Sequence, residues 1–238
     1  MTLIKLFAVA QAMASLQRYS QTRLAVPEDV LQHSGFVVLL CYIIGLELNS
    51  VARNFSPRMP YDKINMEELL CRAIVHDMDE IAVGDIARPI KYLNTETLAM
   101  FEKLKGIGIR KVVDELNVSG KSIAEDIIYA HTHAKLGQSG FIVDVADKAA
   151  VVYKLWDECL RRHNYTVVRH AVHLRDRGFL EELCTRVPNM GFNKEQSFYL
   201  INLIGELTKI LGKVADKSDS ILGNINEVLG NDDEEAAE

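Results

Sequence analysis

The sequence lacks several patterns that assign a protein to a class at once. It has four cysteines, but no two stand at the spacing of a zinc finger or a redox motif, which favours free thiols in a reducing compartment. Its strongly apolar run at residues 36–46 is too short to span a bilayer, so we expect no membrane partner. No series of alternating polar and apolar residues predicts strands, and neither a repeat nor a linker stands out. We therefore expect a cytoplasmic, all-α protein with one domain.

Charge is nearly balanced outside the C-terminal tail. The 238 residues carry a net charge of −6, but residues 231–238 alone hold five acids and no base. The remaining body therefore carries a charge of about −1, which gives no sign of a surface for a nucleic-acid polymer. We expect one domain over residues 1–213 and a polar extension over 214–238 that ends in a disordered acidic tail.

Helical periodicity dominates the chain. Proline or glycine interrupts the helical pattern in predicted loops at residues 56–60 and 84–89. The second of these loops follows the most polar helix and is expected to lie as a turn over the functional site. The predicted helices lie near residues 2–19, 29–53, 65–82, 94–104, 107–116, 121–135, 140–163, 165–186 and 194–213.

The most informative stretch is the apolar run at residues 69–75, because it leads directly into titratable side chains. His76, Asp77, Asp79 and Glu80 follow it. Burying an imidazole and three carboxylates without partners would cost on the order of several kcal/mol. A divalent cation suits neutral histidine nitrogen and carboxylate oxygen together. The stretch therefore predicts a metal site.

Two other segments offer the remaining ligands. His33 lies directly before the apolar run 36–40, and Asp147 lies early in the long apolar helix expected at 140–163. Each has a structural alternative: His33 as a residue of a helix start or core, and Asp147 as a solvent-facing residue that competes with Asp144. Two imidazoles and two carboxylates form a mixed set that suits a borderline divalent ion.

A second metal is the alternative interpretation of His131 and His133. Both lie between the His-Asp pair and the last predicted ligand. We favour a structural role for them, on the surface or beside the ligands.

The order histidine, His-Asp pair and aspartate resembles that of the HD-domain phosphohydrolase superfamily. More closely, the chain is similar to the YfbR-type 5′-deoxynucleotidases and related deoxynucleoside triphosphate hydrolases. Arg18, followed by an aromatic residue, precedes His33; residues 76–80 match His-Asp-x-x-Glu; and residues 84–92 match Gly-Asp-x-x-x-Pro-x-Lys-Tyr. The resemblance covers roughly residues 12–160 and implies a single helical HD domain.

The resemblance implies a metal centre and a proton-transfer group. The implied ligands are His33, His76, Asp77 and Asp147. The implied cofactor is a divalent cation, with cobalt or manganese favoured and zinc, iron or magnesium open. Glu80, one helical turn from His76, would be the general acid/base.

The resemblance also implies residues for the substrate. Arg18 would grip its phosphate with a planar donor fork, and Tyr19 would close over the base or sugar. Asp85 would lie beside the sugar and disfavour ribose. Lys91 would add charge on the phosphate side or hydrogen-bond a residue that contacts the substrate. Arg88 replaces a small hydroxyl residue of the family pattern, so it would narrow the pocket or reach further phosphates.

Three further departures bear on the substrate. Gln32 stands where the family commonly has glutamate, the loop at residues 53–65 is enlarged, and the segment after residue 165 has no match.

The function implied is that of a 5′-deoxynucleotidase that releases phosphate from deoxynucleoside monophosphates and forms homo-oligomers. Two alternatives stay open: a deoxynucleoside triphosphate triphosphohydrolase, and an inactive nucleotide-binding module on the same fold. Base preference, the number of phosphates and the native metal stay open as well.

Overall fold

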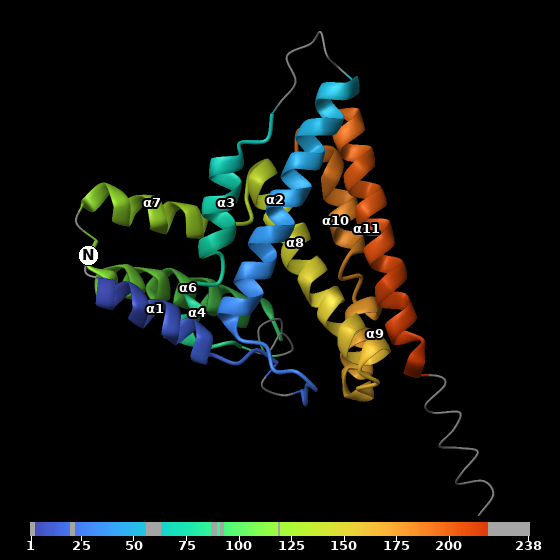
Figure 1. Cartoon of the computed structure of the whole chain (residues 1–238), viewed down its shortest axis with the longest axis horizontal. Coiled ribbons are helices and arrows are strands. Elements are labelled where there is room, and N and C mark those ends of the chain that lie inside the picture. Colours follow the sequence, from blue (N-terminus) through green and yellow to red (C-terminus); the bar gives the residue numbers. More distant parts are fainter. Residues whose placement is uncertain are drawn as a thin grey trace, which may run out of the picture.

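The protein is helical throughout the described part of the chain. The computed structural model describes residues 3–19, 22–55, 63–86, 90, 93–118 and 120–218, and these ranges contain no strand. The predicted all-α fold is confirmed (Figure 1). The α-helices are α1 (Leu3–Ser15), α2 (Val30–Phe55), α3 (Met66–Val75), α4 (Glu80–Val83), α6 (Thr95–Leu116), α7 (Lys121–Thr132), α8 (Gly137–Trp156), α9 (Val168–Asp176), α10 (Glu181–Arg186) and α11 (Lys194–Ala215). A π-helix (Asp157–Arg161) and two 3₁₀ turns (Tyr165–Val167 and Val187–Asn189) complete them.

Helix α8 forms the centre of the main core. Every residue from Ser139 to Val152 is buried, because α2, α3, α9 and α11 all pack against this helix. Leu48 of α2 and Leu200 of α11 are among the fully buried side chains of the same cluster. Each such side chain contributes roughly 1.5–3 kcal/mol to stability through burial. Charged residues on α8 are therefore held in a rigid, largely dry environment.

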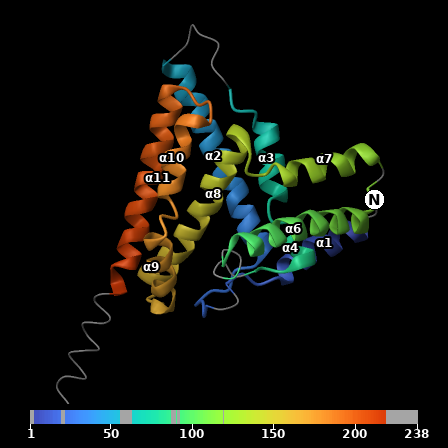
Figure 2. The ribbon, with the colours of Figure 1, turned by 180° about the vertical axis from the view of Figure 1, so that it is seen from behind.

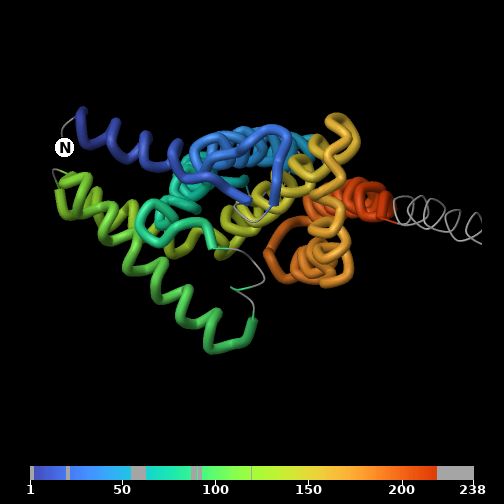
Figure 3. Tube along the Cα trace, turned by 90° about the horizontal axis from the view of Figure 1, so that it is seen from below, coloured from blue at the N-terminus to red at the C-terminus, as the bar shows by residue number. Residues whose placement is uncertain are grey.

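A second layer of helices covers the other side of the molecule. Figures 2 and 3 show α1, α6 and α7 together, apart from α8 to α11, with the segment before α2 running between the two groups. Val9 of α1 packs with Val112 and Leu116 of α6 in a small separate cluster, and Ile81 of α4 lies against it. Helix α4, which begins at Glu80, packs against α1 and α6 and is held in position by them.

Two predicted helix boundaries were wrong because a turn intervenes. The helix predicted at 2–19 ends at Ser15, since residues 16–19 leave the helix and Gln17 forms an isolated bridge with Asp29. The helix predicted at 65–82 is interrupted by a turn at residues 76–79. This turn carries two of the predicted metal ligands.

Two other predicted breaks were misplaced. The helices predicted at 94–104 and 107–116 are one helix, α6, which runs through Gly106 of the predicted break and through Gly108 beyond it. A Cβ at Gly108 would lie 3.0 Å from the carbonyl oxygen of Asp79, so this glycine permits a close approach to the 76–79 turn. Conversely, the helix predicted at 165–186 breaks at Gly178, which adopts a φ of +63°.

Several predictions fall on residues outside the described ranges. These are the whole loop at 56–60, residues 87–89 of the second loop, and the acidic tail. The boundary between the domain and the extension stays a prediction; α11 ends at Ala215.

Helix α2 is the one helix in the described part of the chain that is long and apolar enough to cross a membrane. It extends well beyond the apolar run recognised in the sequence. Its buried face, with Val37, Cys41 and Leu48, packs into the core, and His33 near its start is buried among titratable groups. These contacts are those of a core helix in a globular protein.

A buried glutamate holds the segment that leads into α2. The Glu158 carboxylate is fully buried and accepts hydrogen bonds from the backbone N–H groups of Ala25 and Val26 and from the Asn164 side chain. The Lys154 ammonium lies 3.3 Å away. Burial raises the pKa of Glu158, but these donors outweigh it and hold the pKa below its usual value.

We expect Glu158→Gln to destabilise the protein by about 1–3 kcal/mol at neutral pH, because the amide NH2 would face one of the backbone N–H groups that now donate to the carboxylate. The pKa in the folded protein lies below that of the unfolded chain. The stabilisation is therefore present above about pH 4.5 and is lost as pH falls through the folded-state pKa. Urea unfolding at pH 7 and below pH 4 checks this. An equal difference between wild type and variant at both pH values would contradict it.

Candidate metal centre

The four predicted ligands converge from three parts of the chain. His33 comes from α2, Asp147 from α8, and His76 and Asp77 from the turn after α3. The Nε2 atom of His33 lies 3.1 Å from Oδ1 of Asp147 and 3.6 Å from Oδ2 of Asp77. The Nε2 atom of His76 lies 3.2 Å from the same Asp77 oxygen. Ligand atoms of His33, His76 and Asp77 all lie within 4.8 Å of one another.

In both histidines an oxygen atom lies close to the ring nitrogen Nδ1. Nδ1 of His76 lies 2.7 Å from the carbonyl oxygen of Ala73, and Nδ1 of His33 lies 3.2 Å from Oε1 of Glu28. With a proton on each Nδ1, the Nε2 lone pairs would face carboxylate oxygens, an arrangement that suits a cation between them. The Nε2 atom of His76 is buried and makes no hydrogen bond in the described structure. The residues present therefore fit a divalent metal.

Asp147 is held at both of its oxygens. Oδ1 faces His33, while the Lys135 ammonium lies 2.5 Å from Oδ2. Burial raises the pKa of Asp147, but Lys135 and His33 outweigh it and hold the pKa well below its usual range. The loop that carries Lys135 is tied to α3, because Arg72 donates to the backbone carbonyls of His133 and Leu136. Asp147 is thus an ionised carboxylate with one oxygen directed at the centre.

Arg18 and Glu80 lie on the other side of the centre. The Arg18 guanidinium donates to Asp77 Oδ2 at 2.9 Å and lies 4.0 Å from Glu80 Oε2. Burial raises the pKa of Asp77, but His76 and Arg18 outweigh it and keep this carboxyl ionised. Burial, followed by the charge of Asp77, raises the pKa of Glu80 to about 9. The buried Oε2 atom of Glu80 has no hydrogen bond, so this carboxyl is placed to hold a proton beside the centre.

Tyr19 and Asp85 are joined to each other. The backbone N–H of Tyr19 donates to Oδ2 of Asp85 at 3.1 Å, and Tyr19 adopts a φ of 58°, which is unusual for a residue with a Cβ. The Tyr19 ring packs edge-on against His170. One oxygen of Asp85 therefore fixes the chain beside Arg18. The predicted sugar contact of Asp85 stays a prediction.

The remaining predicted residues divide into two groups. Arg88 and Lys91 lie outside the described residues. His131 is buried, and its Nε2 lies 2.7 Å from Oδ1 of Asp79. His133 instead stacks on Tyr129 and hydrogen-bonds the Tyr129 carbonyl. The two histidines thus face different partners.

Sequence reasoning missed two contributors to the centre, Glu28 and Lys135. Glu28 precedes α2 and reaches His33 across one turn, although the sequence there indicates only a helix start. Gln32, where the family pattern has glutamate, is exposed and forms a reciprocal cap with Asp29. Spacing gives no signal for Lys135, because its contact depends on the turn before α8.

Glu28→Ala should weaken metal binding about 10- to 100-fold, because His33 would lose the acceptor that orients it. Glu28→Gln should cost less, since its amide oxygen can still accept from Nδ1. Competition with a chromophoric chelator measures both. A matched change at exposed Glu67 (Glu67→Ala) should leave affinity unchanged, and unaltered affinity in Glu28→Ala would show that Glu28 does not orient the ligand.

Comparison with known proteins assigns the family. The model of the 5′-deoxynucleotidase YfbR-like family matches residues 5–176. The chain belongs to the YfbR-like family. It is 26% identical over 158 residues to a 5′-deoxynucleotidase of Klebsiella pneumoniae strain 342, with 66% of this chain and 74% of the relative covered. It is 24% identical over the same length to the 5′-deoxynucleotidase YfbR of Escherichia coli strain SMS-3-5, with the same coverage. The predicted family is confirmed.

Solved structures support the fold of this YfbR-like protein. An HD-domain phosphohydrolase from Listeria innocua superposes with a TM-score of 0.55 at 18% identity and covers 88% of this chain and 99% of its own. The cyanophage S-2L HD phosphohydrolase DatZ, bound to dA and one catalytic Zn²⁺ ion, gives a TM-score of 0.51 at 19% identity, with 85% and 95% covered. At these identities the likeness concerns the fold alone.

Proposed function

We propose that the protein is a metal-dependent 5′-deoxynucleotidase that releases phosphate from deoxynucleoside monophosphates. Membership of the YfbR-like family supports the reaction class. The observation that carries the proposal is the convergence of His33, His76 and Asp77 beside a buried Glu80. A purely structural helical protein would have no use for the buried Nε2 atom of His76, which makes no hydrogen bond in the described structure.

The metal would be held by His33, His76, Asp77 and Asp147. When bound, a divalent cation supplies Lewis-acid chemistry, polarising a phosphoryl oxygen and lowering the pKa of bound water. Cobalt or manganese suits this mixed nitrogen and oxygen set, and the zinc ion bound to DatZ keeps zinc as a candidate.

Residues of the chain would bind the substrate and transfer the protons. Arg18 would bind the phosphate with two parallel N–H donors and offset the charge that develops on it. Glu80, whose pKa is raised by burial, would hold a proton and deliver it to the departing 5′ oxygen, then take one from the incoming water. Asp85 would accept from the sugar hydroxyl, while Tyr19 would cover the base or sugar.

Phosphate release from a panel of deoxy- and ribonucleotides, with cobalt, manganese or zinc added, tests the proposal. We expect deoxynucleoside monophosphates to be hydrolysed in preference to their ribose counterparts. Release of triphosphate from deoxynucleoside triphosphates would instead favour the triphosphohydrolase. No product from any nucleotide, with nucleotide binding retained, would favour the inactive binding module.

Self-association is a further part of the proposal. Tyr42 and Leu46 of α2 and Phe198 and Ile201 of α11 are apolar and between 42% and 68% exposed. Exposed apolar side chains that gather on neighbouring helices are typical of an interface between subunits. We therefore propose a homo-oligomer, which light scattering of wild type and Phe198→Glu would test. A monomeric wild type would contradict it.

We also propose a cytoplasmic location. All four cysteines are free thiols, which suits a reducing compartment. Fractionation of cells that express the native protein tests the location.

A further inference from the structure

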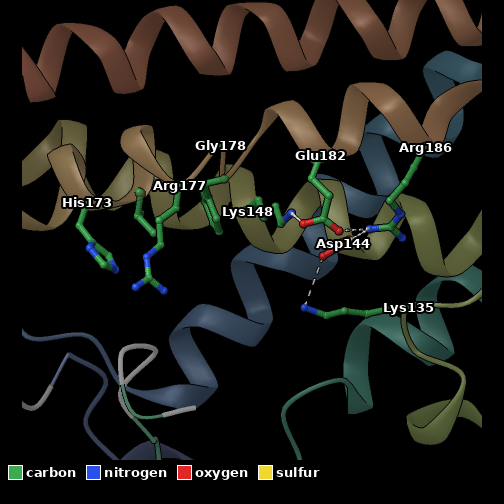
Figure 4. Close-up of a pocket in the computed structure, with 10 residues that line it drawn as sticks. Lys135, Asp144, Lys148, His173, Arg177, Gly178, Glu182 and Arg186 are labelled. Atoms are coloured by element: carbon green, nitrogen blue, oxygen red, sulfur yellow. Dashed lines mark hydrogen bonds and ion pairs between the residues drawn. The ribbon is translucent and has the colours of Figure 1, made fainter. Parts of the chain in front are cut away.

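A basic cavity lies beside the metal centre, on the side of α8 to α10. Its volume is about 380 Å³, within the range of pockets that hold small ligands. Figure 4 shows His173 and Arg177 projecting from the α9 end of the cavity and Lys135 approaching Asp144 from the opposite wall. The basic side chains that line it are Lys135, Lys148, His173, Arg177 and Arg186.

The charges in the cavity do not balance. Four permanent cations line it, against the two carboxylates of Asp144 and Glu182; since Lys135 also pairs with Asp147 at the metal centre, a net charge of about +1 remains. Asp144 pairs with Arg186 at 2.5 Å and with Lys135 at 3.6 Å. Glu182 lies 3.7 Å from Arg186 and 3.8 Å from Lys148. Both carboxylates are thus already shared between cations, so the cavity favours an anion.

Arg177 is the cation with the clearest capacity to bind a ligand. Its side chain is exposed and, among the described residues, makes no hydrogen bond or ion pair. His173 lies one helical turn before it, so the two side chains share a face of the chain. A guanidinium without a protein partner, directed into a cavity of like charge, is a donor available to phosphate oxygens.

Lys135 connects the cavity to the metal centre. Its ammonium lies 2.5 Å from Oδ2 of Asp147, a proposed ligand, and 3.6 Å from Oδ1 of Asp144 in the cavity wall. The basic cavity and the metal centre are therefore adjacent. The family match ends at residue 176, so Arg177, Glu182 and Arg186 lie beyond the segment that assigns the family.

We propose that this cavity is a second phosphate-binding site, which holds the phosphate groups of a polyphosphate anion. Two kinds of molecule could supply these phosphate groups. One is the β- and γ-phosphates of a nucleotide whose other end lies at the metal centre, and this source rests on the proposed metal centre acting on deoxynucleoside triphosphates. The other is a free inorganic polyphosphate, which binds whether or not the protein hydrolyses nucleotides.

Calorimetric titration of the full chain with inorganic tripolyphosphate tests the site. The protein is first dialysed against chelator, so that the probe cannot bind through a metal. We expect saturable binding at one site that weakens with added salt, and about a tenfold loss of affinity in Arg177→Gln. Arg177→Lys should lose less affinity for tripolyphosphate, because lysine keeps the positive charge although it lacks the paired N–H donors of the guanidinium. Arg169→Gln, an equal change of charge at an exposed position of α9 outside the cavity, should bind as wild type does.

Kinetics of the metal-loaded enzyme then identify the source. If nucleotide phosphates occupy the cavity, Arg177→Gln lowers kcat/KM for deoxynucleoside triphosphates about tenfold and leaves that for monophosphates unchanged. If the ligand is a free anion, both values stay unchanged and only tripolyphosphate binding is lost. Absence of tripolyphosphate binding to wild type, or equal binding by wild type and Arg177→Gln, would overturn the proposal. Because the titration needs no catalysis, an inactive enzyme would count against the proposed function and leave the second site standing.

Discussion

Glu80→Gln should lower kcat roughly 10²- to 10⁴-fold while the protein still binds its metal. The substitution keeps the size of the side chain but removes the proton that a carboxyl exchanges. Glu80 lies near Arg18, and no contact in the described structure brings it to His33, His76 or Asp147. Steady-state kinetics together with elemental analysis of the same preparation measure both quantities.

Glu115→Gln is the matched control for this prediction. Glu115 is exposed on α6 and lies outside the centre, so its amide should leave kcat and metal content unchanged. If Glu80→Gln turned over substrate at the wild-type rate, Glu80 would not be the general acid/base. If it lost its metal, its role would be to hold the centre together.

Asp77→Asn should weaken metal binding by at least about a hundredfold and reduce activity in proportion. Loss of residues that merely orient ligands already costs about 10- to 100-fold in affinity, and Asp77 is a proposed ligand itself. Its Oδ2 atom lies 3.6 Å from Nε2 of His33 and 3.2 Å from Nε2 of His76, and it also accepts from Arg18. Chelator competition gives the affinity, and added metal should restore part of the activity.

Asp126→Asn on the exposed surface of α7 controls for the change of charge and should bind metal normally. A normal affinity in Asp77→Asn would remove Asp77 from the ligand set. The remaining nitrogen and oxygen atoms would then have to form the centre with another residue.

The ligand set could be predicted because buried polar groups require partners. His33, His76, Asp77 and Asp147 each stand in or beside an apolar helical stretch, and burial of such groups is costly unless they pair or bind a cation. That constraint acts on residue type and local pattern, both of which are visible in a sequence. The helical fold was predictable for the same reason, since apolar periodicity is a local property.

The supporting contacts could not be predicted, because they depend on how turns are closed. Glu28 reaches His33 only because the chain before α2 folds back, and Lys135 reaches Asp147 only because the turn at residues 133–136 is bound by Arg72. Gly108 lies within a predicted helix, and its close approach to the carbonyl oxygen of Asp79 could not be foreseen. Local propensity does not encode which segment will approach such a glycine.

Anomalous X-ray diffraction from crystals of the metal-loaded protein, measured at the absorption edge of the metal, tests the central claim most directly. We expect a single strong peak per chain, bonded to the Nε2 atoms of His33 and His76 and to oxygens of Asp77 and Asp147. A peak held instead by His131 and Asp79, or one that leaves Asp147 paired only with Lys135, would contradict the proposed centre.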